Sequence, residues 1–201
     1  MSKDSAVKIL PSSPSKTSVS AVDFPCEMYN DALFFKEEAK KLDPTSENYR
    51  LRWRYLRASI IFSLTSTEAY VNTFISDHVS NTLGQPDMAQ KLSKKRLSLD
   101  TKLEYILPLT TGKRMDKTKK EWIDYKAIRK IRDKLVHYDK GEEIYKDKAP
   151  YGINMANAEK GIEMVRGIVK QLCALTKKRY PPWVDQTQSW IPVNIENSSY
   201  T

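Results

Sequence analysis

Apolar residues recur at helical spacing through most of the chain, and no segment shows the alternating pattern of a strand. The longest helical pattern runs from Tyr49 to about Leu83 without a proline or glycine, which predicts one long central helix. Shorter patterns predict helices over about 25–42, 88–107, 118–139 and 155–179. The predicted fold class is therefore all-α, an up-and-down helical bundle of about five helices. The expected buried face of the central helix consists of Leu56, Ile60, Ser63, Leu64, Thr67, Val71, Phe74, Ile75 and His78.

Prolines, glycines and capping residues set the expected ends of these helices. The run "GQPD" (84–87) ends the central helix, Pro108 stops the third helix, and Asn154 caps the last one. Thr45 or Ser46 is the expected cap of the central helix. The first helix should place Met28, Ala32, Phe35 and Leu42 on its apolar stripe. The fourth should bury Trp122, Tyr125, Ile128, Ile131, Leu135 and Tyr138.

The pattern divides the chain into three parts. Residues 1–23 are rich in Ser, Pro and Lys, and we expect a flexible N-terminal arm there. The helical bundle is assigned to residues 24–179. Pro181 and Pro182 forbid further helix, so residues 180–201 are expected to form a non-helical tail. Apolar residues predict that this tail packs on the bundle: Trp183, Trp190 and Ile191.

Composition narrows the kinds of partner and chemistry. A net charge of +9 on 201 residues favours an anionic partner such as nucleic acid. Two distant cysteines favour a reducing cytoplasm, and no apolar run is long enough to predict a membrane span. The glycines form no phosphate-binding loop, and the histidines and cysteines have no metal-ligand spacing, so neither a cofactor nor a metal is expected.

The segment "RKIRDKLVHYDKG" (129–141) carries the main candidate chemistry. Arg132 and His137 are separated by roughly 140° of helical arc, so they are neighbours that only a long side chain can join. Asp133 lies one turn before His137, where its carboxylate can bind the imidazole and raise its pKa. An imidazole that moves a proton beside a guanidinium that neutralises phosphate charge suits phosphodiester cleavage. The alternative is an ordinary histidine that contacts the last carbonyls of a basic helix.

The central helix adds a carboxylate in an unusual place. Glu68 lies in "STEAYVNTFI" (66–75), an otherwise uncharged run, with Asn72 one turn later. A carboxylate in a core helix is costly unless an arginine or another donor meets it. Arg132 is the first candidate for that partner, and the alternative is that Glu68 only ties two helices together.

Together with "LDTKLEYILPLTTGK", these two segments resemble the HEPN superfamily of helical-bundle proteins in helix order over about residues 27–179. The resemblance rests on R-x4-H with an acidic residue after the arginine, and on the earlier Glu followed by Asn. It implies a metal-independent endoribonuclease of toxin–antitoxin or antiviral type, which leaves a 2′,3′-cyclic phosphate. His137 would then act as general acid and base and Arg132 would stabilise the phosphorane, with Asp133 and Glu68 orienting them. Asn72 would support the site.

The resemblance also implies a homodimer in which two R-x4-H motifs line one cleft. Many HEPN domains are inactive, so a non-catalytic interaction module, or a subunit bound to an antitoxin or a defence complex, is the alternative. A basic DNA-binding bundle is a third reading. The expected RNA contacts are Lys113, Arg114, Lys117, Arg129, Lys130, Lys134 and Tyr138. For these basic residues the alternative is a solvated helix face, and for Tyr138 a place in the core.

Overall fold

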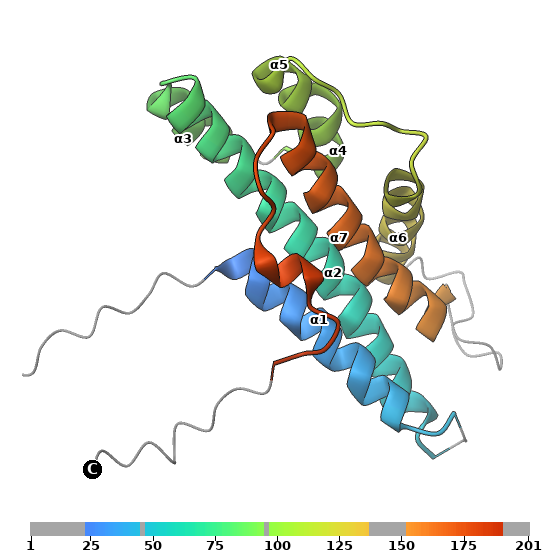
Figure 1. Cartoon of the computed structure of the whole chain (residues 1–201). Helices are drawn as coiled ribbons and strands as arrows, with labels where there is room; N and C mark the ends of the chain where they lie inside the picture. The colour runs from blue at the N-terminus through green and yellow to red at the C-terminus, as the bar shows by residue number, and fades with distance from the viewer. Residues whose placement is uncertain (1–22, 45–46, 95–96, 137–151, 191–201) are drawn as a thin grey trace, which may run out of the picture.

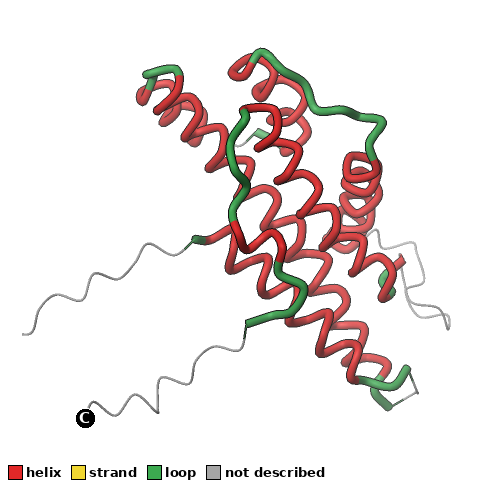
Figure 2. Tube along the Cα trace, in the orientation of Figure 1, coloured by secondary structure: helices red, strands yellow, loops and turns green. Residues whose placement is uncertain are grey.

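The computed structural model describes residues 23–44, 47–94, 97–136 and 152–190. Within these ranges the chain is all-α, without a strand, which confirms the predicted fold class (Figure 2). The longer helices are α1 (Phe24–Lys41), α2 (Tyr49–Asp77), α3 (Pro86–Lys94), α6 (Lys120–Val136) and α7 (Met155–Thr176). Helix α2 is central: α1 packs along it, α7 packs on both, and α6 packs mainly on α7 (Figure 1).

The buried face of α2 agrees with the sequence. All nine predicted positions are buried, including the polar Ser63, Thr67 and His78. Ser59 and Ser66 are also buried, and their hydroxyls donate to carbonyls of α1, those of Ala32 at 2.8 Å and Pro25 at 2.7 Å. These small side chains let the two helices approach closely while each buried hydroxyl keeps a partner. The helix ends in a π-helical turn, η1 (His78–Thr82), close to the predicted boundary.

The predicted third helix is wrong in two respects. It is divided into α3 and a second helical segment made of α4 (Leu99–Thr101), the π-helical η2 (Lys102–Ile106) and α5 (Leu107–Thr111). Ser98 caps the second segment, since its side chain accepts a hydrogen bond from the Thr101 N–H. Pro108 does not stop it, because the wide turn of η2 changes the hydrogen-bond pattern just before a residue that has no N–H to donate. The segment ends at Gly112, whose φ of +69° suits glycine.

Helices α6 and α7 pack at very short range. A Cβ at Gly167 of α7 would lie only 2.5 Å from the Cβ of Glu121, so the glycine sets the spacing of the two backbones. Asn154 caps α7 as predicted, accepting from the Asn157 N–H at 2.8 Å. Of the predicted α6 stripe, Trp122, Tyr125 and Ile128 are buried, Ile131 and Leu135 are half-buried, and Tyr138 lies outside the described residues.

The predicted stripe of α1 is mostly wrong. Ala32 is buried, but Met28, Phe35 and Leu42 are only half-buried, and Tyr29 and Leu33 fill the core instead. The reason is that the C-terminal tail covers α1 on a second side, through Trp183, Ser189 and Trp190. The spacing of apolar residues within α1 does not predict contacts with a segment so far away in the sequence. The proposed caps Thr45 and Ser46 lie outside the described residues.

The described part of the C-terminal tail lies against the bundle. Its 3-10 turn, η4 (Pro182–Asp185), buries Trp183, whose ring centroid is 5.2 Å from that of Tyr29. Farther along, the backbone N–H of Trp190 donates to Asn30 Oδ1 at 2.7 Å, while the residue stays 42% exposed. Ile191 is not described. Among the described helices, none has the length and apolar character needed to cross a bilayer.

Candidate functional site

Three of the four predicted catalytic residues line one pocket. It has a volume of about 340 Å³ and lies where α2, α4 and the second half of α6 meet. Glu68 comes from α2, and Arg132 and Asp133 come from α6. Apolar side chains and the capping serine complete the wall with Arg129: Leu64, Ser98, Leu99 and Tyr125. His137 lies outside the described residues, directly after the last turn of α6.

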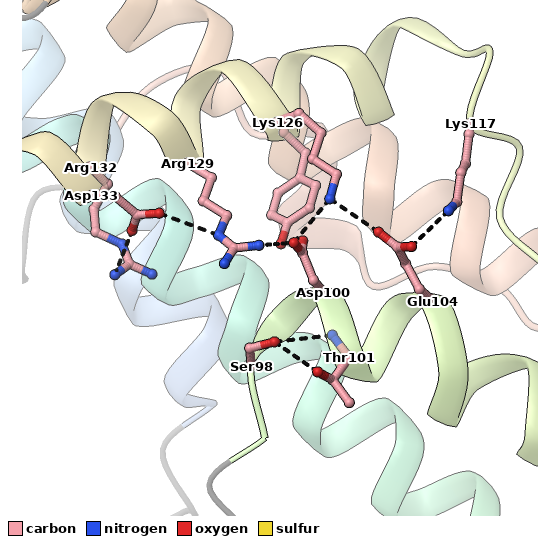
Figure 3. A network of polar contacts seen from close by, with 10 residues as sticks. Ser98, Asp100, Thr101, Glu104, Lys117, Lys126, Arg129, Arg132 and Asp133 are labelled. Carbon is pink, nitrogen blue, oxygen red and sulfur yellow. Dashed lines mark hydrogen bonds and ion pairs between the residues drawn. The ribbon is translucent and has the colours of Figure 1, made fainter.

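Within this pocket Asp133 binds arginines. Its carboxylate forms ion pairs with Arg132 Nη1 at 3.0 Å and with Arg129 Nε at 3.5 Å (Figure 3). The predicted contact between Asp133 and His137 lies outside the described residues. The Arg132 side chain lines the pocket and is 33% exposed.

The expectation for Glu68 needs correction. It was expected to be sequestered and to face Arg132, but its side chain is 44% exposed and its ion-pair partner is Lys102 of η2, at 3.4 Å. Glu68 and Arg132 share the pocket wall, yet no ion pair joins them in the described part of the chain. A run of uncharged neighbours does not show which side of a helix is covered, and here this side of α2 is only partly covered. Asn72 is exposed and lines a different pocket, of about 410 Å³, with Glu68 and Phe24.

Two carboxylates that the sequence did not single out, Asp100 and Glu104, pair with basic residues beside the pocket. Asp100 of α4 accepts from Tyr125 Oη at 2.6 Å and Lys126 Nζ at 3.0 Å, and it also pairs with Arg129 Nη1. Glu104 accepts from Lys117 Nζ at 2.8 Å and Lys126 Nζ at 3.1 Å (Figure 3). Asp100 and Glu104 lie one turn apart, and they face Lys126 and Arg129, which are three positions apart on α6. This matching spacing of acidic and basic residues was the feature of the sequence that could have identified the two carboxylates.

These contacts perturb several pKa values. Burial raises the pKa of Asp100, but the hydrogen bonds from Tyr125, Lys126 and Arg129 outweigh it and hold the pKa below its ordinary value. Hydrogen bonds from Lys117 and Lys126 lower the pKa of Glu104. Burial, reinforced by the hydrogen bond to Asp100, raises the pKa of Tyr125, which is therefore a neutral donor at neutral pH.

These lowered pKa values predict acid sensitivity. The two carboxyls contribute stability that is fully present above their ordinary pKa values of 3.8 and 4.5, and that is lost as pH falls through the lower folded-state values. Thermal unfolding of wild type and of Asp100→Asn/Glu104→Gln should therefore be compared at pH 6 and pH 3. We expect the Tm of the double variant to fall less between pH 6 and pH 3 than the Tm of wild type. An equal fall of Tm in both proteins would contradict the stabilising role of these two carboxylates.

The predicted RNA-binding residues fall into two groups. Arg129, Lys130 and Lys134 line an open concavity of about 400 Å³ on α6. Among the described residues of its lining, Lys126 is a fourth cation and Asp133 is the one carboxylate. In the loop before α6, Lys113 donates to the Leu175 carbonyl near the end of α7 at 2.7 Å, and Lys117 binds Glu104. Arg114 is exposed, and Tyr138 is outside the described residues. Positive charge is therefore concentrated on α6 beside the pocket.

His78, predicted on the buried face of the central helix, is buried. Its Nε2 is 3.1 Å from the Thr110 carbonyl and its ring stacks on Phe74. Among the described residues no group of three His, Cys, Asp or Glu side chains is placed to hold a metal ion.

Comparison with known proteins adds no assignment. No protein-family model, curated protein or solved structure matches the chain.

Proposed function

We propose that this protein is a metal-independent endoribonuclease of the HEPN type, acting in the cytoplasm in a toxin–antitoxin or antiviral role. The observation that carries the proposal is the position of Arg132. Its guanidinium lines a pocket beside a strongly basic concavity, in the last two turns of the helix that leads directly to His137. That combination supplies an anion-binding group, a route for a polyanion and a titratable group within one short segment.

The reaction that suits these groups is transfer within the RNA strand. His137 removes the proton from a ribose 2′-OH, and the oxygen forms a bond to the adjacent phosphorus. Arg132 neutralises charge on the five-coordinate phosphorus. The bond from phosphorus to the 5′-oxygen then breaks, and that oxygen takes up the proton that His137 removed from the 2′-OH. The products are a 2′,3′-cyclic phosphate and a 5′-hydroxyl, and no step requires a metal ion.

A second copy of the chain completes the proposed site. On an ideal helix that continued to position 137, Arg132 and His137 would be separated by roughly 140° of arc, which would make convergence on one phosphate difficult. A homodimer with two copies of α6 across a shared cleft would let the guanidinium of one protomer act beside the imidazole of the other. Lys130 and Lys134 would then hold the RNA backbone along the approach to that cleft.

The chemistry of the products tests this proposal. Single-stranded RNA incubated with the protein in EDTA should yield fragments that end in a 2′,3′-cyclic phosphate. The matched control is the same oligonucleotide with one 2′-deoxy nucleotide at the mapped cleavage position, which removes the attacking oxygen and should block cleavage there alone. Cleavage at the deoxy position, or fragments with a 5′-phosphate, would contradict the mechanism.

A non-catalytic interaction module is the second candidate, and a specific surface favours it. Tyr105 and Leu109 lie about one turn apart and are 65% and 81% exposed, which is unusual for large apolar side chains. Expression in a host cell separates the two functions. Growth arrest that Arg132→Ala relieves would support the nuclease, whereas arrest that only Tyr105→Ser/Leu109→Ser relieves would support a binding module.

A further inference from the structure

Arg132 is connected to the buried core by a continuous series of side-chain contacts. The Tyr125 hydroxyl donates to Asp100, Asp100 pairs with Arg129, Arg129 binds Asp133, and Asp133 binds Arg132. Figure 3 shows the part from Asp100 to Arg132 extending along α6 above α4. The two ends differ in burial, because Tyr125 is fully buried whereas the Arg132 side chain is 33% exposed.

We propose that Asp100 and Tyr125 are positioning residues for the ribonuclease reaction, holding the Arg132 guanidinium through Arg129 and Asp133. The inference rests on the function proposed above and adds two residues that do not themselves touch RNA. Long arginine side chains lose considerable conformational entropy when they are fixed. A guanidinium already paired with a carboxylate that is itself fixed by a second arginine makes part of that loss during folding, before RNA binds.

The geometry favours positioning over simple charge balance. Tyr125 adds no charge, yet its hydroxyl hydrogen-bonds Asp100 at 2.6 Å from a ring fixed in the core. Arg129 bridges two carboxylates on different elements, Asp100 of α4 and Asp133 of α6. A guanidinium held from two directions has a defined orientation, whereas a lysine in that place would not.

Glu104 provides a matched control because it has the same charge and lies one turn after Asp100. Its partners are Lys117 and Lys126, and Figure 3 shows no contact from Glu104 to Arg129, Asp133 or Arg132. Asp100→Asn and Glu104→Gln each remove one negative charge near the α6 concavity. Both should therefore raise RNA affinity to a similar, modest extent. Any difference between them in the chemical step reports on the contact series.

The experiment measures kcat and KM for RNA cleavage in wild type, Asp100→Asn, Glu104→Gln and Tyr125→Phe. Asp100→Asn should lower kcat roughly 10- to 100-fold without raising KM, as expected when a catalytic group is misplaced. Glu104→Gln should leave kcat within about twofold of wild type. Tyr125→Phe keeps the buried ring and should lower kcat less than Asp100→Asn does. Equal kcat values in Asp100→Asn and Glu104→Gln would overturn the proposal.

A second readout separates this inference from the proposed function. Solvent exchange of the guanidinium N–H groups of Arg129 and Arg132, followed by NMR without RNA, should become faster in Asp100→Asn and Tyr125→Phe but not in Glu104→Gln. If wild type cleaves no RNA, the proposed function fails while this exchange pattern still decides the positioning. Unchanged exchange in Asp100→Asn would overturn the positioning whatever the activity.

Discussion

Replacing Arg132 or His137 with alanine is expected to lower the rate of RNA cleavage at least 100-fold. Removing a group that stabilises charge in a transition state typically costs about 2.7–4 kcal/mol, which corresponds to a 10²- to 10³-fold loss of rate. Losing the proton-transfer group costs a similar factor, about 10²- to 10⁴-fold. The measurement is the single-turnover cleavage rate of single-stranded RNA in EDTA, with enzyme in excess so that weaker binding does not mask the chemical step.

Arg50→Ala is the matched control for Arg132→Ala. Arg50 is an exposed arginine on α2, eighteen residues before Glu68 and so about 27 Å away along the helix. The Arg50→Ala substitution removes the same charge from the protein without changing a residue of the pocket. We expect the cleavage rate of this variant to stay within about twofold of wild type. If the cleavage rates of Arg132→Ala and Arg50→Ala fall equally, the loss of rate reflects net charge and the catalytic role of Arg132 is wrong.

A mixture of two single variants tests the composite site. Mixing Arg132→Ala with His137→Ala protomers should restore part of the activity if each shared cleft takes one group from each copy. About a quarter of wild-type activity is expected, since about half of the randomly formed dimers are mixed and each of these retains one of its two composite sites intact. No restoration on mixing would place both groups of one site on the same protomer.

The long helices could be predicted because apolar residues recur at helical spacing along each of them. All nine predicted positions of α2 are buried, and the Asn154 cap of α7 was recognisable from its residue type and place. The third helix could not be predicted well. Its π-helical turn before Pro108 depends on packing against neighbouring elements, and a proline in the sequence alone favours a helix end. The face of α1 failed for a related reason, because the tail that covers it comes from 150 residues later.

The site was only partly accessible from the sequence. Spacing on one helix was enough to bring Arg132, Asp133 and Arg129 into the same region. The partner of Glu68 was not predictable, since pairing between helices depends on their relative rotation, and Lys102 reaches Glu68 where Arg132 was expected. Asp100 was overlooked because an acid at the start of a helix is ordinary by composition. Only its position against Tyr125 and Arg129 gives it significance.

Ile128→Ala should destabilise the fold by about 2–5 kcal/mol, the usual cost of removing a fully buried aliphatic side chain. Ile128 is fully buried on α6, between the Tyr125 and Ile131 turns, so its packing helps to fix the helix that carries Arg129 and Arg132. The measurement is the midpoint of urea unfolding followed by circular dichroism. A loss below about 1 kcal/mol would mean that α6 is not held to the bundle as described.

Ile123→Ala on the same helix supplies the control. Ile123 is 57% exposed, and both substitutions gain the same helix propensity, so their difference isolates burial. We expect Ile123→Ala to change stability by no more than about 0.5 kcal/mol. At temperatures where both variants remain folded, Ile128→Ala should also lower RNA cleavage, because a loosened α6 releases the contacts that orient Arg132. Stability and activity therefore fall together at Ile128, whereas at Arg132 only activity falls, and this contrast separates a residue that positions the helix from one that acts on RNA.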